Sequence, residues 1–132
     1  MLRTMIVEDE FTSRKILNAM LRPLGPCDVA ADGQEALTAF GAALKEGERY
    51  DLMCLDITMP DMSGREVLKK IREMEEAAGV GGLDRVKVIM TTASDDRENI
   101  MGSFRSECDA YLVKPIELDR LMSTIGSLGL GL

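Results

Sequence analysis

Polar side chains that can do chemistry follow four apolar runs of this sequence. Glu8 and Asp9 come directly after the first run, and Asp56 closes a later run, "LMCLD". Hydroxyl and ammonium groups follow the other two runs, and these belong to Thr91, Thr92, Ser94 and Lys114. If the fold brings the ends of these runs together, three carboxylates, a hydroxyl and a lysine share one pocket.

Such a pocket suits a metal ion and a phosphoryl group. Three crowded carboxylates cannot all ionise unaided, because like charges raise one another's pKa. A hard cation such as Mg²⁺ relieves the repulsion, since it prefers oxygen ligands and often binds carboxylates together with a phosphate. A lysine adds a compact positive charge beside it. An aspartate in this setting can attack a phosphoryl group in line and form an aspartyl phosphate.

The elements that must position these residues alternate between strands and helices. Short apolar runs predict strands at residues 3–7, 27–31, 50–56, 86–91 and 110–114. Apolar residues at helical spacing predict helices at residues 11–24, 32–47, 65–78, 96–107 and 117–128. Asp32 with Glu35, and Ser63 with Glu66, have capping-box spacing at two helix starts. Five strand–helix units in a row indicate an α/β fold with a parallel sheet.

The parallel sheet predicts where the polar groups meet. In open parallel sheets, ligands bind beyond the carboxyl ends of the strands, near the point where the strand order reverses. All of the polar groups named above follow such strand ends, whereas the second strand ends in Ala31 and Asp32, which have the pattern of a plain helix entry. We therefore expect the acids, the hydroxyl and the lysine to converge at one edge of the sheet.

Composition excludes several other function classes. The 132 residues carry a net charge of −7 without a basic stripe, which argues against nucleic-acid binding. The chain has no histidine, which removes histidine triads and most zinc sites. Cys27, Cys54 and Cys108 form no CxxC motif and are expected to be small buried residues. No apolar run can span a bilayer and no signal-peptide pattern opens the chain, so we expect a cytoplasmic protein.

Four motifs give this chain a family resemblance. "VEDE", "LDITMPDMSG", "VIMTTAS" and "AYLVKP" occur in this order across nearly the whole sequence. Together they resemble the receiver domain of two-component response regulators, and most closely the stand-alone, chemotaxis-type, CheY-like regulators. The resemblance implies one receiver domain over residues 1–132. It also implies a flavodoxin-like, doubly wound five-stranded parallel sheet with strand order 2-1-3-4-5 and helices on both faces.

The resemblance assigns a phosphoacceptor and a metal site. Asp56 matches the phosphoacceptor, and Glu8 and Asp9 match the acidic pair that holds Mg²⁺ together with Asp56 and the backbone carbonyl of Thr58. Glu8 stands where many relatives have aspartate. Whether Glu8 would contact the metal directly or through water stays open.

Further residues match the groups that bind and sense the phosphoryl group. Thr92, which keeps the family spacing better than Thr91, matches the hydroxyl that bonds the phosphoryl group, and Lys114 matches the phosphoryl-contacting lysine. The Lys114–Pro115 peptide is usually cis in this family. Tyr111 matches the switch aromatic, and Gly64 fits the tight turn after the acceptor loop.

The resemblance also implies a lifetime control and an output face. Thr58 and Ser94 match positions that border the path of the hydrolytic water, and their small size predicts a short-lived phosphoryl group. The predicted output face lies on the fourth helix, fifth strand and fifth helix, and its residues are Ile100, Phe104, Tyr111 and Val113. The implied phosphodonor is a histidine kinase or a phosphotransfer protein, and the implied output is an unidentified protein target.

Simpler interpretations exist for each residue alone. Asp9, Thr92 and Ser94 could cap helices, Asp56 could be a turn residue and Lys114 could be a solvated lysine. Independent caps would not reproduce the whole set at successive strand ends.

Two alternative functions remain beside the signalling module. One is an aspartyl-phosphate phosphatase of the haloacid dehalogenase type, which would need a second acid where this chain has Thr58. The other is a receiver cut from a longer regulator. We expect a signalling phosphoacceptor that catalyses only its own phosphorylation and dephosphorylation. The sequence does not identify the kinase, the target or the oligomeric state, nor whether the chain controls a motor or acts as a phosphate sink.

Overall fold

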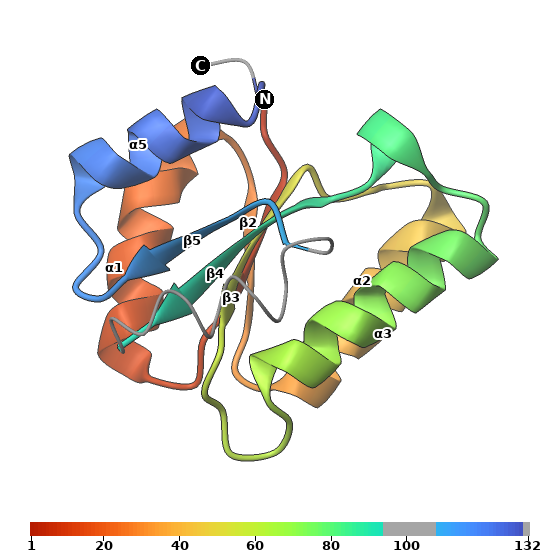
Figure 1. The fold of residues 1–132 in the computed structure, drawn as a ribbon, viewed down its shortest axis with the longest axis horizontal. Helices are drawn as coiled ribbons and strands as arrows, with labels where there is room; N and C mark the ends of the chain where they lie inside the picture. The colour runs from red at the N-terminus through yellow and green to blue at the C-terminus, as the bar shows by residue number, and fades with distance from the viewer. Residues whose placement is uncertain (94–107, 131–132) are drawn as a thin grey trace.

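The computed structural model describes residues 1–93 and 108–130 and contains a five-stranded parallel sheet (Figure 1). The strands are β1 (Thr4–Val7), β2 (Cys27–Ala30), β3 (Leu52–Asp56), β4 (Lys87–Thr92) and β5 (Ala110–Val113). The described helices are α1 (Phe11–Leu21), α2 (Gly33–Glu46), α3 (Gly64–Ala77) and α5 (Leu118–Ser127), with 3₁₀ turns at Arg22–Leu24 and Gly82–Asp84. The helix predicted at residues 96–107 lies outside the described residues. The strand order β2-β1-β3-β4-β5 confirms the predicted order.

Helices cover both faces of the sheet, as predicted. Helices α1 and α5 lie on one face, and α2 and α3 lie on the other (Figure 1). Side chains of β3 alternate between the two layers, so that Met53 and Leu55 pack toward α2 and α3, and Leu52 and Cys54 pack toward α1 and α5. The central strand is therefore buried on both sides, which explains its nearly continuous apolar sequence.

Both predicted capping residues begin their helices. The Asp32 side chain accepts a hydrogen bond from the backbone N–H of Glu35 at 2.8 Å, and Ser63 Oγ accepts one from Glu66 at 3.3 Å. The Glu35 carboxylate in turn accepts a hydrogen bond from the backbone N–H of Ala31, one residue before the cap. These contacts satisfy N–H groups that a helix start otherwise leaves without partners.

The cysteine prediction holds in two cases of three. Cys54 and Cys108 are buried, whereas Cys27 is partly exposed because β2 is an edge strand. Burial raises the pKa of the Cys54 thiol to about 12, so this side chain is an inert part of the core.

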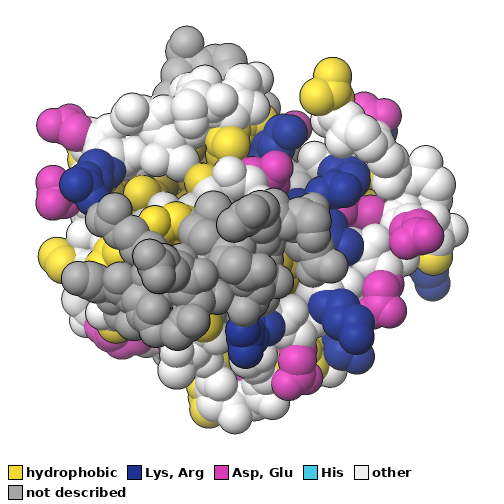
Figure 2. All heavy atoms as spheres, in the orientation of Figure 1, with side chains coloured by type: hydrophobic (Ala, Val, Ile, Leu, Met, Phe, Trp, Pro, Cys, Tyr) yellow, Lys and Arg dark blue, Asp and Glu magenta, His cyan; other side chains and the backbone are white. Residues whose placement is uncertain are grey.

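The surface around α3 carries both signs of charge. Lys and Arg side chains are interspersed with Asp and Glu side chains there (Figure 2). No helix in the two described ranges is long and apolar enough to cross a lipid bilayer.

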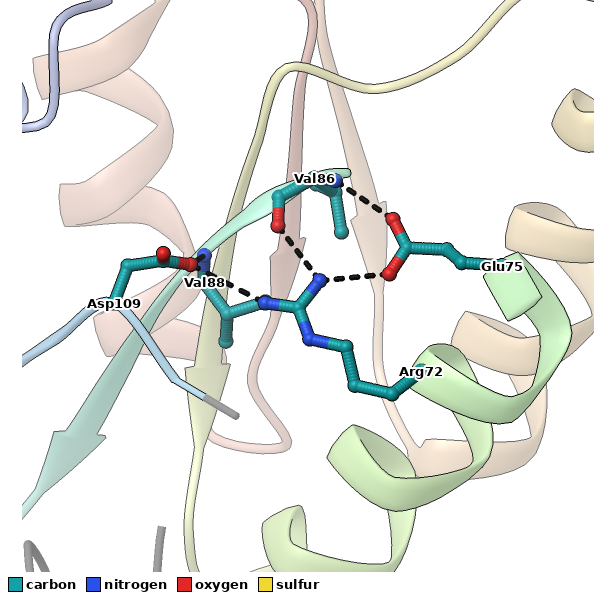
Figure 3. A network of polar contacts seen from close by, with 5 residues as sticks. All are labelled: Arg72, Glu75, Val86, Val88 and Asp109. Atoms are coloured by element: carbon teal, nitrogen blue, oxygen red, sulfur yellow. Dashed lines mark hydrogen bonds and ion pairs between the residues drawn. The ribbon is translucent and has the colours of Figure 1, made fainter. Parts of the chain in front are cut away.

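A partly buried ionic network joins α3 to the starts of β4 and β5 (Figure 3). The Arg72 guanidinium donates to Glu75 Oε1 at 2.7 Å, to the Val86 carbonyl at 2.9 Å and to Asp109 Oδ2 at 3.2 Å. The Glu75 and Asp109 carboxylates in turn accept the N–H groups of Val86 and Val88. The network lies at the amino ends of these strands, so it anchors the sheet at the edge opposite the predicted site.

We expect Arg72→Ala to lower the free energy of unfolding by about 3 kcal/mol, because it leaves the buried Glu75 carboxylate without its cation. Lys70→Ala, at an exposed position of the same helix, is the matched control and should cost less than about 0.5 kcal/mol. Urea denaturation of both variants measures the difference. Equal costs for the two substitutions would show that the network does not stabilise the fold.

Candidate functional site

The three predicted acids meet at the carboxyl end of the sheet. Val7 of β1 pairs with Leu55 of β3, so the residues that follow, Glu8 and Asp56, lie side by side. Both are buried, with exposed fractions of 1% and 4%, whereas Asp9 is exposed. One carboxylate oxygen from each acid lies within 4.8 Å of those of the other two. Carboxylates placed this closely can share a cation.

Lys114 reaches the acids from the carboxyl end of the edge strand β5. Its Nζ lies 2.8 Å from Glu8 Oε2 and 3.5 Å from Asp56 Oδ2. The Lys114 N–H donates to the Thr92 carbonyl, which extends the pairing of β4 and β5 by one residue. The Lys114–Pro115 peptide is cis, as the family resemblance implied. The predicted convergence of acids and lysine is therefore present.

The two candidate threonines occupy different places at the end of β4. Thr91 pairs with Asp56 in the β3–β4 ladder, and Thr92 pairs with Val113 in the β4–β5 ladder. Both threonines are buried, and the Thr91 hydroxyl has no hydrogen-bond partner among the described residues. Ser94 lies outside the described residues.

The turn after β3 holds Asp56 in position. The Thr58 N–H donates to Asp56 Oδ1 at 3.1 Å, while the Thr58 residue itself is exposed. The Gly64 N–H donates to the Ile57 carbonyl at 2.8 Å. A Cβ atom at Gly64 would lie 2.8 Å from Ile57 Cα and would collide with the Asp56 carbonyl oxygen. Gly64 is thus required by close backbone packing beneath the acceptor loop, in agreement with its predicted place in a tight turn.

Two site residues escaped the sequence analysis. Arg14, in the first turns of α1, donates to the backbone carbonyls of Glu8 at 3.1 Å and Asp9 at 2.9 Å. Asp61 accepts the N–H groups of Gly33 and Gln34, each at 3.1 Å, and so ties the acceptor loop to the start of α2. An arginine five residues after an acidic pair, in the first turn of the predicted helix, was a usable signal for Arg14. No local signal marked Asp61, because its partners are 27 or more positions away.

Part of the predicted output face is described. Tyr111 is half-buried and packs against the core layer that contains α2 and α3, and Val113 is half-buried. Ile100 and Phe104 lie outside the described residues, so the output face stays a prediction.

The crowded charges shift the pKa values of two groups. Burial, followed by the nearby Glu8 carboxylate, raises the pKa of Asp56 to about 6, although the Thr58 N–H and Lys114 act in the opposite direction. For Lys114, burial alone lowers the pKa, but the hydrogen bond to Glu8 and the attraction of Asp56 outweigh it, and the pKa is raised. Lys114 is therefore a cation at neutral pH. Keeping Asp56 ionised in the folded protein costs free energy.

We expect Asp56→Asn to stabilise the metal-free protein at pH 7.5. A carboxyl group whose pKa rises on folding binds its proton more tightly in the folded state, so its contribution to stability falls as pH rises from about 4 to about 6. Removing the charge should raise the free energy of unfolding by about 1–2 kcal/mol at pH 7.5, after allowance for solvent screening, and should leave it almost unchanged near pH 4. Urea denaturation of wild type and variant in chelator tests this. A gain that does not change with pH would contradict the assignment of the cost to ionised Asp56.

Comparison with known proteins places this geometry in a family. Residues 4–126 match the family model of the response regulator receiver domain. The chain is 35% identical over 114 residues to the chemotaxis protein CheY-3 of Vibrio cholerae, a match that covers 86% of this chain and 81% of that protein. It is 34% identical over 129 residues to the hybrid signal transduction histidine kinase L of Dictyostelium discoideum, covering 96% of this chain but only 7% of the kinase.

A solved structure agrees with the sequence matches. The receiver domain of the histidine kinase CKI1 from Arabidopsis thaliana, determined in complex with Mg²⁺ and BeF₃⁻, superposes with a TM-score of 0.83 at 26% identity. The superposition covers 98% of this chain and 90% of that one. With the family match over nearly its whole length, the chain belongs to the response regulator receiver domain family.

Proposed function

We propose that this receiver domain accepts a phosphoryl group on Asp56 from the phosphohistidine of a histidine kinase or a phosphotransfer protein. The observation that carries the proposal is the joint placement of three carboxylates within 4.8 Å of one another and of the Lys114 ammonium 3.5 Å from Asp56. A phosphoryl group on Asp56 would bring further negative oxygens to this place, which only a site supplied with cations can stabilise.

The donor set fits Mg²⁺. Glu8, Asp9 and Asp56 offer hard oxygen ligands, and the exposure of Asp9 leaves one side open to water, which Mg²⁺ usually retains. The backbone carbonyl of Thr58 would complete the protein ligands, as the family resemblance implies. When bound, Mg²⁺ supplies positive charge that offsets the repulsion among the carboxylates and the phosphoryl oxygens.

The residues of the chain then perform distinct tasks in the transfer. An oxygen of Asp56 attacks the phosphorus in line, the phosphorus–nitrogen bond of phosphohistidine breaks, and its electron pair stays on the imidazole nitrogen. The Thr58 N–H fixes the orientation of the Asp56 carboxylate by holding Oδ1. Lys114 neutralises charge beside Asp56, and the Thr92 hydroxyl bonds a phosphoryl oxygen.

The same site sets how long the signal lasts. Hydrolysis requires water to reach the acyl phosphate past residues 58 and 94, and both Thr58 and Ser94 are small. The exposure of Thr58 supports an open path on its side. We propose a phosphoryl lifetime of seconds to minutes.

Output would follow from a shift between two packed states. Thr92 drawn toward the phosphoryl group would leave space for Tyr111 to turn inward and would reshape the face formed with Ile100, Phe104 and Val113. That Tyr111 is half-buried rather than fully packed supports room for such a change. We also propose that residues 1–132 form a single domain and that the protein is cytoplasmic. A protein target would dock on this face.

The phosphatase alternative is not favoured. Hydrolases of the haloacid dehalogenase type place a second acid two residues after the nucleophile, where this chain has Thr58. The relationship to receivers over residues 4–126 points to signalling instead.

Incubation with Mg²⁺ and acetyl phosphate should add one phosphoryl group to the wild-type protein and none to Asp56→Asn, because the amide is not a nucleophile. Intact-mass measurement at neutral pH detects the adduct, which should be lost at alkaline pH. Asp84→Asn, at an exposed acid of the turn before β4 and thus at the opposite end of that strand from Thr92, is the matched control and should label normally. Equal labelling of Asp56→Asn and wild type would refute the assignment of Asp56.

Asp9→Ala should weaken Mg²⁺ binding by about tenfold or more, because it removes a charged oxygen ligand. An amide NMR titration without phosphodonor measures the affinity. Glu10→Ala removes the next acid of the chain, which lies outside the three-acid cluster, and controls for the loss of charge alone. If the two variants bind Mg²⁺ equally well, Asp9 has no specific role as a ligand.

A further inference from the structure

Both oxygens of the Glu8 carboxylate already have partners. Glu8 Oε1 accepts the backbone N–H of Glu10 at 3.3 Å, and Oε2 accepts Lys114 Nζ at 2.8 Å. The residue is 1% exposed, so water cannot easily replace either bond. Glu8, which is a proposed metal ligand, therefore bonds other groups of the protein in the described structure.

The backbone of Glu8 is fixed on both sides. Its N–H donates to the Ala30 carbonyl at 3.0 Å, and its carbonyl accepts from Arg14 at 3.1 Å. With the main chain held, the length of the side chain decides where the carboxylate lies. An aspartate at this position would withdraw the carboxylate by roughly one carbon–carbon bond, about 1.5 Å. The 2.8 Å contact with Lys114 could not survive that withdrawal without movement of the lysine.

The Lys114 ammonium lies between two of the three acids and favours Glu8. Its distance to Glu8 is 2.8 Å, compared with 3.5 Å to Asp56. We propose that the Glu8–Lys114 ion pair is an internal competitor of the divalent cation, and that the length of the Glu8 side chain sets how strongly it competes. This inference rests on the proposed function, which assigns Glu8 and Asp56 to the metal site.

The competition couples metal binding to the availability of Lys114. If Glu8 bound the cation, its carboxylate would no longer hold the Lys114 ammonium, which could then turn to Asp56 and its phosphoryl group. Without the cation, Lys114 stays on Glu8, and the group meant to stabilise the phosphoryl oxygens is withheld. On this proposal, a weakened affinity for the cation and a dependence of phosphorylation on the cation would have one structural source, the Glu8–Lys114 ion pair.

A double-mutant cycle tests the competition. The Mg²⁺ affinity of wild type, Glu8→Asp, Lys114→Met and the double variant is measured by amide NMR titration without phosphodonor. Glu8→Asp should bind Mg²⁺ about fivefold or more tightly than wild type, because the metal no longer has to break a charge-assisted hydrogen bond. In the Lys114→Met background, the same substitution should give no gain, since the competitor is already absent.

Two results would overturn the inference. One is a Glu8→Asp affinity no tighter than wild type, and the other is an equal gain in both backgrounds, which would trace the effect to ligand geometry alone. Labelling of the wild type by acetyl phosphate separates this inference from the proposed function. Normal labelling on Asp56 with either of these results leaves the proposed function standing, whereas a wild type that neither labels nor binds Mg²⁺ refutes both.

Discussion

Glu8, Asp9 and Asp56 present carboxylate oxygens within 4.8 Å of one another, and two of these side chains are buried, so positive charge must offset their repulsion. In the described structure Lys114 supplies part of that charge. Burial, followed by the nearby Glu8 carboxylate, still raises the pKa of Asp56 to about 6, although the Thr58 N–H and Lys114 act in the opposite direction. Under the proposed function, a divalent cation would supply the positive charge that Lys114 does not.

Such a site depends on a scaffold that holds like charges together. The two apolar layers on either side of β3 fix the register of β1, β3 and β4, and the register places Glu8 beside Asp56. The Arg72 network anchors the opposite edge of the sheet, where no functional residue is proposed. This network thus stabilises the strand ends that carry no site residue, as expected when a functional site is itself unfavourable.

Backbone hydrogen bonds connect the charged residues to this scaffold. Arg14 holds the carbonyls of the acidic pair from α1, and Asp61 holds the acceptor loop to the start of α2. The hydrogen bonds that the Gly33 and Gln34 N–H groups donate to Asp61 hold the pKa of this carboxyl group below its usual range. Asp61 is therefore ionised at any physiological pH, and its carboxylate can keep the loop in place. A loop fixed in this way can present Asp56 in one orientation to an incoming phosphoryl group.

The sequence alone determined the alternation of strands and helices, the caps at Asp32 and Ser63, and the location of the polar groups at strand ends, because these follow from apolar periodicity and local hydrogen bonding. Only the tertiary structure decided that Lys114 bonds Glu8 in preference to Asp56, and that Asp61 caps a helix formed earlier in the chain. Glu8 and Lys114 are 106 positions apart, and their distance depends on strand register and on the length of each side chain. No local pattern encodes either quantity, because both arise when the two core layers pack and fix the strands against one another.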